Sequence, residues 1–197
     1  AMAWGEDSYV SDTNLTGNAL DNFLVGSYGA NTIDGGAGND LLTVTLAANA
    51  LTAVTLTNVS NIERLTVSVS ALNAGTITLV NANFATVTGA AITASSLTTG
   101  TFSLDASAEV ESTFSITGGG GADTIIGGQV ADTISGGTGA DVITGGSGAD
   151  SLTGGLGADT FVYASVAQSN GTATDTITDF VTGEDKLQVT LNYSTLV

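Results

Sequence analysis

The sequence contains no cysteine, no histidine and no proline, and only two of its 197 residues are basic, Arg64 and Lys186. Without cysteine the chain has neither a disulfide framework nor a thiolate metal site, and without histidine it lacks an imidazole base and any histidine-ligated zinc. Nucleic-acid binding requires a basic face, which two cations do not supply. No apolar run is long enough to span a membrane. We therefore expect a protein that is not an enzyme, binds no nucleic acid and has no membrane span.

Five blocks of nine residues follow one another between Gly118 and Val162 in the pattern G-G-x-G-x-D-x-U-x, where U is a large apolar residue, and four of the five keep every fixed position. The glycines permit a tight turn with positive φ that exposes carbonyl oxygens. The aspartate brings a carboxylate to the same point, and such hard oxygen ligands suit Ca²⁺. The pattern is the signature of a calcium-binding parallel β-roll. One apolar side chain per block is expected to point inward, and these form a thin core of Ile125, Ile134, Ile143, Leu152 and Phe161.

These blocks resemble the nonapeptides of the repeats-in-toxin (RTX) family. The resemblance implies an all-β, right-handed parallel β-solenoid in which each Ca²⁺ lies between loops eighteen residues apart. It also implies three calcium sites built from backbone carbonyls and two aspartates: the first from Gly119, Gly121, Asp123, Gly136, Thr138 and Asp141, the second from Gly128, Val130, Asp132, Gly145, Ser147 and Asp150, and the third from Gly137, Gly139, Asp141, Gly154, Leu156 and Asp159. Val130 departs from the pattern, and a β-branched residue disfavours unusual turn geometry.

A weaker group of repeats covers residues 16–43. The block Gly35–Thr43 is a full match, whereas residues 16–24 form a degraded copy with Asp21 in the aspartate position and Phe23 in the apolar position. One further calcium site is expected here, although the two aspartates are nineteen residues apart rather than eighteen. Its ligands would be Gly17, Ala19, Asp21, Gly35, Ala37 and Asp40.

Residues 44–117 alternate Thr or Ser with apolar residues, as in Leu65-Thr66-Val67-Ser68-Val69. A period of two with β-branched residues predicts strands. The absence of proline and the low charge favour a β-solenoid on the same axis, and a separate β-sandwich is the alternative. The acids Glu109 and Glu111 are interpreted as solvated surface residues. Two segments of this region, 59–65 and 103–107, loosely resemble β-solenoid parts of bacterial surface-layer proteins.

Residues 163–197 are interpreted as a cap, because the end of a solenoid exposes unpaired strands. The segments 175–180 and 183–187 resemble the sequence that closes RTX rolls. Asp179 is the preferred ligand for an additional calcium, and Asp175 and Asp185 are further candidates. The expected organisation is thus an N-terminal segment (1–15), a short repeat group (16–43), a Thr/Val/Ala-rich solenoid (44–117), the nonapeptide roll (118–162) and the cap (163–197).

The charge agrees with calcium-dependent folding. The formal net charge of −17 opposes compaction, and about five Ca²⁺ ions would bring it toward about −7. An ion that binds only the folded state stabilises it by mass action. We expect weak sites of this kind to fill at millimolar extracellular calcium, not at micromolar cytosolic calcium.

Two functions fit this sequence. The first is an exported, non-enzymatic structural protein that folds on Ca²⁺ and assembles with copies of itself into a surface layer, sheet or filament, with a cell-surface polysaccharide as a candidate partner. The alternative is an RTX secretion and folding module of a larger hydrolase or adhesin exported by type I secretion. Both interpretations place the protein outside the cell, and the first places it at the cell surface.

Overall fold

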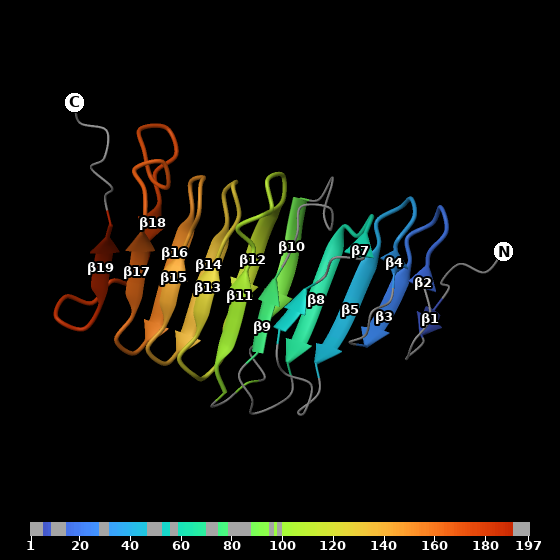
Figure 1. Cartoon of the computed structure of the whole chain (residues 1–197), viewed down its shortest axis with the longest axis horizontal. Helices are drawn as coiled ribbons and strands as arrows, with labels where there is room; N and C mark the ends of the chain where they lie inside the picture. Colours follow the sequence, from blue (N-terminus) through green and yellow to red (C-terminus); the bar gives the residue numbers. More distant parts are fainter. Residues whose placement is uncertain are drawn as a thin grey trace.

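The computed structural model describes residues 6–8, 15–27, 32–46, 53–55, 59–69, 75–78, 88–94, 97 and 100–190. Every pair of neighbouring strands in these residues is parallel. The same residues contain no helix that could cross a membrane. The strands lie side by side along the long axis of the molecule, with the first and the last described strands at opposite ends (Figure 1). The fold is therefore an all-β parallel solenoid, as the repeats predict.

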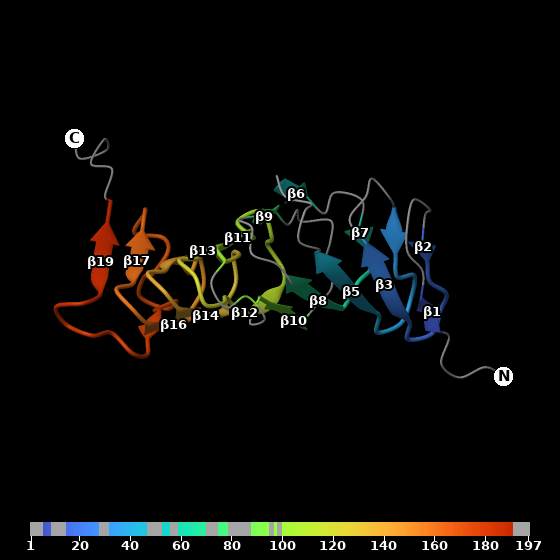
Figure 2. The same cartoon turned by 90° about the horizontal axis from the view of Figure 1, so that it is seen from below.

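Two sheets form the C-terminal part. The larger sheet has seven strands in the order β19 (Lys186–Val189), β17 (Thr160–Tyr163), β15 (Val142–Thr144), β13 (Thr124–Ile126), β11 (Phe102–Asp105), β9 (Gly75–Thr78) and β6 (Ala53–Thr55). The smaller sheet has five strands in the order β10 (Thr88–Thr93), β12 (Thr113–Thr117), β14 (Thr133–Thr138), β16 (Ser151–Leu156) and β18 (Thr176–Ile177). Figure 2 shows them as two facing layers.

Two further sheets form the N-terminal part. One has the order β1 (Glu6–Ser8), β3 (Phe23–Ser27), β5 (Leu41–Leu46) and β8 (Arg64–Val69), and the other has the order β2 (Leu15–Thr16), β4 (Ile33–Asp34) and β7 (Val59–Ser60). Strand β8 contacts β10, so the four-stranded sheet and the five-stranded sheet continue one another along the axis (Figure 2).

The core is a thin row of apolar side chains between the layers, set by the strand register. Ile125 pairs with Ile143, and Ile143 with Phe161; on the other layer Ile134 pairs with Leu152. All five are at most 1% exposed, which confirms the core predicted from the nonapeptides. Adjacent strands in one layer are eighteen residues apart here, so two nonapeptides make one coil.

The Thr-rich section belongs to the same stack. Strand β11 (102–105) pairs with β13 and β12 (113–117) pairs with β14, so the section joins the roll through both layers. This arrangement favours the expected solenoid over the alternative β-sandwich. Phe102, Leu104, Phe114 and Ile116 extend the core into this section.

Candidate metal centres

Stacked loops connect the two layers, and their spacing requires glycine. The backbone N–H of Thr138 donates to the carbonyl of Gly119 at 2.9 Å, and that of Ser147 donates to the carbonyl of Gly128 at 3.1 Å. At Gly155 the φ angle is +104°, and a Cβ would overlap the carbonyl oxygen of Gly137. Both the left-handed backbone and the close approach exclude a side chain there.

Two columns of aspartates run along these loops. In each column the backbone N–H of one aspartate donates to Oδ1 of the next, as from Asp123 to Asp141 at 2.8 Å and from Asp132 to Asp150 at 2.9 Å. Within the roll each bond spans one coil of eighteen residues, and the last bond of each column spans 26 or 25 residues to the cap. The first column is Asp123, Asp141, Asp159 and Asp185, and the second is Asp132, Asp150 and Asp175. All but Asp175 are buried.

Whether the second oxygen, Oδ2, of these carboxylates has a hydrogen-bond partner depends on the conformation of the neighbouring glycine. Gly119 and Gly128 have no left-handed φ, and their N–H groups donate to Oδ2 of Asp123 and Asp132. In the later copies the equivalent glycine has a positive φ, and the aspartate Oδ2 is buried without a hydrogen-bond partner. This second group comprises Gly137, Gly146 and Gly155 with Asp141, Asp150 and Asp159. The glycines of the first two copies therefore do not adopt the positive φ expected from the sequence.

Burial holds these carboxyls toward their neutral form. It raises the pKa of Asp132 and Asp141 to about 6, and that of Asp150 to about 7, although backbone hydrogen bonds oppose the change. Neighbouring aspartates add to the effect at Asp141 and Asp150. A buried carboxylate without a partner is costly, so these oxygens favour a bound cation.

At the first glycine of each of the first three blocks, two oxygens converge. A Cβ on Gly136 would overlap both Oδ2 of Asp141 and the carbonyl oxygen of Gly154 in the next loop. Gly127 and Gly118, the first glycines of the two preceding blocks, have equivalent neighbours. No three carboxylates gather into a metal-binding cluster in the described part of the chain. An ion at these loops would thus take carbonyl oxygens beside the aspartates, and this all-oxygen donor set suits Ca²⁺.

The structure brings together the aspartate pairs of all three predicted sites in the roll. Asp123 lies beside Asp141, Asp132 beside Asp150 and Asp141 beside Asp159. Three predicted carbonyl ligands, those of Gly119, Gly128 and Leu156, accept backbone hydrogen bonds from the adjacent loop. The loop at Val130 stacks like the others, since Gly148 packs against its backbone. Calcium coordination by these residues stays a prediction.

The first repeat copy is in a different phase from the one predicted. Leu24 pairs with Leu42, so Asn22 and not Asp21 lies eighteen residues before Asp40, and its N–H donates to Asp40 Oδ1 at 2.7 Å. Leu24 is buried whereas Phe23 is 42% exposed. Because the aspartate position lies two residues before the core residue, counting back from Leu24 would have identified Asn22. Asp21 is exposed and accepts from the N–H of Asn39.

The other predicted ligands of this N-terminal site lie in two stacked loops. Gly17 packs against the carbonyl of Gly35, and the N–H of Ala37 donates to the carbonyl of Asn18. Ala19 is exposed in the first loop, next to Asn18. Asp40 is fully buried, and its Oδ2 has no partner. The loops thus meet as predicted, with Asn22 in place of Asp21.

At the C-terminal end Asp175 and Asp185 continue the columns. Asp175 accepts from the N–H of Asp150, and Asp185 accepts from that of Asp159, both at 3.0 Å. Asp179, the preferred ligand from the sequence, lies outside the columns and accepts from the N–H groups of Gly154 and Gly155. The structure therefore favours Asp175 and Asp185 as the terminal column members.

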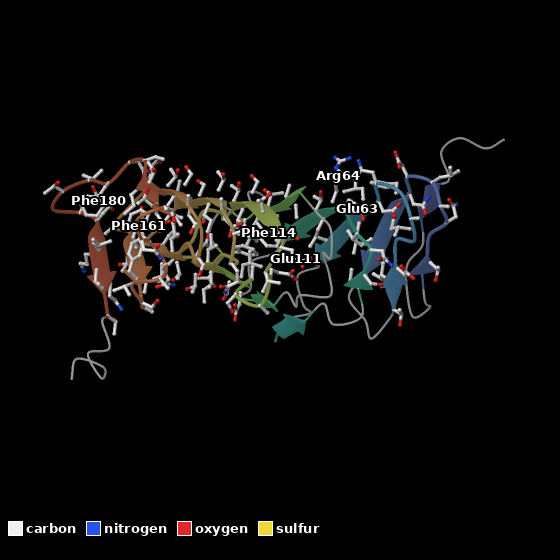
Figure 3. The ribbon with its side chains drawn as sticks, turned by 90° about the horizontal axis from the view of Figure 1, so that it is seen from above. Glu63, Arg64, Glu111, Phe114, Phe161 and Phe180 are labelled. Atoms are coloured by element: carbon white, nitrogen blue, oxygen red, sulfur yellow. The ribbon has the colours of Figure 1, made fainter. Side chains whose placement is uncertain are left out.

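The cap covers the end of the core. The rings of Phe161 and Phe180 have centroids 6.2 Å apart (Figure 3). The side chain of Tyr163 is hydrogen-bonded to Asp175. Burial, together with this hydrogen bond, raises the pKa of the tyrosine. The predicted capping role of the segment 175–187 agrees with these contacts.

Glu109 is not the surface acid that the sequence suggested. It is fully buried, both carboxylate oxygens lack a hydrogen-bond partner, and burial raises its pKa to about 7. Its carbonyl accepts from the N–H of Gln129, so its loop stacks against the roll. Glu111, two residues later, is exposed as expected. No repeat pattern marks Glu109, which is why sequence reasoning missed it.

Comparison with known proteins gives one family match. A family model described as Peptidase M10 serralysin C terminal matches residues 14–195. A search of curated proteins found no match.

Proposed function

We propose, because the chain belongs to the Peptidase M10 serralysin C-terminal family, that it is a calcium-binding repeat module which folds as the ion binds and serves an exported protein. The matched region of that family is the non-catalytic, repeat-bearing C-terminal part of serralysin-type peptidases. The absence of histidine and cysteine in these 197 residues agrees with a non-catalytic role.

The observation that carries this proposal is the set of buried, unpartnered Oδ2 atoms on Asp141, Asp150 and Asp159. Arg64 and Lys186, the only cationic side chains of the sequence, are exposed and leave these oxygens without a counter-ion. Bound calcium supplies positive charge and accepts six to eight oxygen ligands. The aspartates then hold consecutive loops at a fixed distance, so ion binding and coil stacking become one process.

The calcium concentration at which such sites bind the ion supports export of the protein. Sites built on carbonyls and two carboxylates suit the millimolar calcium outside cells. In the low calcium of the cytosol the acidic repeats repel one another and stay unfolded. The chain would therefore leave the cell unfolded and fold outside it.

The test is calcium binding and folding of the chain with one column aspartate changed. Asp141→Asn removes a carboxylate shared by two predicted sites, because Asp141 lies next to both Asp123 and Asp159. The variant keeps a side-chain oxygen but loses the negative charge of a ligand. Changing even an outer partner of a metal ligand costs about 10–100-fold in metal affinity, so calcium affinity at these sites should fall by about tenfold or more. Isothermal titration calorimetry and far-ultraviolet circular dichroism measure the loss.

Glu111→Gln is the control, since it removes an exposed acid away from the columns. It should leave affinity and calcium-induced β-structure unchanged. A wild-type chain that folds fully in chelator, or an Asp141→Asn variant with unchanged binding, would contradict the proposal.

The second candidate function is self-assembly into a sheet or filament at the cell surface. It is favoured by the terminal strand β19, which among the described strands has a neighbour on one edge alone, and which exposes Leu187 by 53% and Val189 by 51%. Open strand edges pair readily with other strands. At the opposite end β1 and β2 are the edge strands of the part that the structure describes, so end-to-end stacking would form an open, repeating contact. A cell-surface polysaccharide stays a candidate anchor.

Electron microscopy and sedimentation test this second function. Millimolar calcium should produce ordered sheets or filaments that disperse in chelator, and Leu187→Lys should prevent them without loss of calcium binding. Monomers at every calcium concentration would overturn self-assembly and leave the folding module intact.

A further inference from the structure

A short corner near the start of the Thr-rich section stacks on a repeat loop. Strand β7 pairs with β4, and β8 pairs with β5, so the corner 60–63 lies directly against the loop 34–40. The N–H of Gly35 donates to the carbonyl of Ser60 at 3.0 Å, and the N–H of Glu63 donates to that of Asp40 at 3.2 Å. The corner has no glycine and does not fit the nonapeptide pattern.

Glu63 nevertheless occupies the aspartate position of this corner. The N–H of Asp40 donates to Oε2 of Glu63 at 2.8 Å. The N–H of Asp123 makes the equivalent bond to Oδ1 of Asp141 in the roll, also at 2.8 Å. Figure 3 shows Glu63 beside Arg64, whose guanidinium points out of the solenoid. The column of carboxylates at this edge therefore continues from Asp40 to Glu63.

Asn61 occupies the position of the first glycine. Its φ is +52°, and it is the only non-glycine residue with positive φ in the described part of the chain. A Cβ on Gly35 would overlap the carbonyl oxygen of Asn61 and would lie 2.7 Å from Oδ2 of Asp40. Gly136 has the same two neighbours in the roll, the carbonyl of Gly154 and Oδ2 of Asp141. The Asn61 amide fixes the corner by donating to Oδ1 of Asp34 at 2.7 Å.

The carboxylate of Asp40 is not neutralised by any neighbouring group of the described residues. It is fully buried, and its Oδ2 has no hydrogen-bond partner. Three further acids, Glu63, Asp21 and Asp34, lie near enough to add negative charge around it. As at Asp141, the second glycine of the loop, Gly36, has a positive φ of 94°. The orphaned oxygen thus lies next to a carbonyl oxygen in the same way as in the roll.

We propose that Asp40, Glu63 and the carbonyl oxygen of Asn61 bind a Ca²⁺ ion between the loop 34–40 and the corner 60–63. The site rests on the proposed calcium function and extends it to a corner that carries no repeat. Its ligands are hard oxygens, two of them from carboxylates. The ion joins the N-terminal repeats to the Thr-rich section, because β5 and β8 meet at this corner.

Calcium stoichiometry of the full chain tests the site. Equilibrium dialysis at saturating calcium should find one ion fewer in Glu63→Gln than in the wild type. The exposed-acid control Glu111→Gln should keep the wild-type number. Asn61→Gly should also keep it, since glycine allows the same φ and retains the carbonyl.

An unchanged ion count in Glu63→Gln would overturn the proposal. Wild-type crystals soaked with Tb³⁺ give a second readout that needs no variant, namely an anomalous peak between Asp40 and Glu63. Peaks in the roll without one at this corner would also overturn it. A wild-type chain that binds no calcium at all would instead contradict the proposed function.

Discussion

Single carboxylates differ in this protein according to what lies against them. Asp132 has both oxygens bonded to backbone N–H groups, whereas Asp141 has one oxygen bonded and one buried without a partner. Glu109 has neither oxygen bonded. Because ionisation is unfavourable for a buried carboxyl without a partner, Glu109 makes the fold pH-dependent independently of the aspartate columns.

Glu109→Gln should remove this pH dependence. The folded-state pKa of about 7 lies above the ordinary value of 4.5, so the stabilisation by the protonated form is complete below about pH 4.5 and is lost as the pH rises through about 7. From pH 4.5 to 8 the stability of the variant relative to wild type should therefore rise by roughly 3 kcal/mol. Urea unfolding at several pH values measures this change. Glu111→Gln is the matched control, and an equal pH profile in both variants would contradict the assignment.

At the scale of the element, the corners determine how the strands stack. Gly155 combines a left-handed φ with the close approach of the Gly137 carbonyl. Gly183 in the cap also has a left-handed φ, of 93°, but a Cβ there would meet nothing within 4 Å. This pair of glycines separates the conformational cost of a side chain from the cost of forcing two coils apart.

Gly155→Ala should therefore destabilise the protein more than Gly183→Ala. A left-handed φ costs a non-glycine residue about 1–2 kcal/mol, and both variants bear this cost. Only Gly155→Ala also displaces the neighbouring loop, so it should in addition weaken calcium binding at the Asp141–Asp159 pair. Urea unfolding and calorimetric titration in calcium compare the two. Equal losses of stability with equal calcium affinity would show that the loops do not need this contact.

At the scale of the whole molecule, stability depends on neutralising a net charge of −17. The solenoid has a thin core and long columns of buried carboxyls, so each coil is stabilised by its neighbours and by whatever neutralises its loops. Because the sequence has only two cationic side chains, calcium ions and protons are what can neutralise the remaining negative charge.

The calcium-free chain should expand at pH 8, with a radius of gyration approaching roughly 50 Å, the value for an unfolded chain of this length. Millimolar calcium should contract it. Acidification without calcium should contract it in part. The raised pKa values of Asp132 and Asp141, about 6, and of Asp150, about 7, mean that the fold binds more protons than the unfolded chain, so stability rises as the pH falls toward the ordinary value of 3.8. Small-angle X-ray scattering measures both effects, and a compact chelated chain at pH 8 would contradict them.

The sequence by itself determined the parallel solenoid, the core row from Ile125 to Phe161 and the aspartate pairs of the roll. These follow from a local pattern that repeats in fixed phase, so each block specifies its own turn, strand and inward side chain. Only the tertiary structure decided that Asn22 replaces Asp21, that Glu109 is buried and that Asn61 and Glu63 reproduce a repeat corner. Each of these depends on the coil stacked against the residue, which lies eighteen or more positions away and is fixed by strand register rather than by neighbouring sequence.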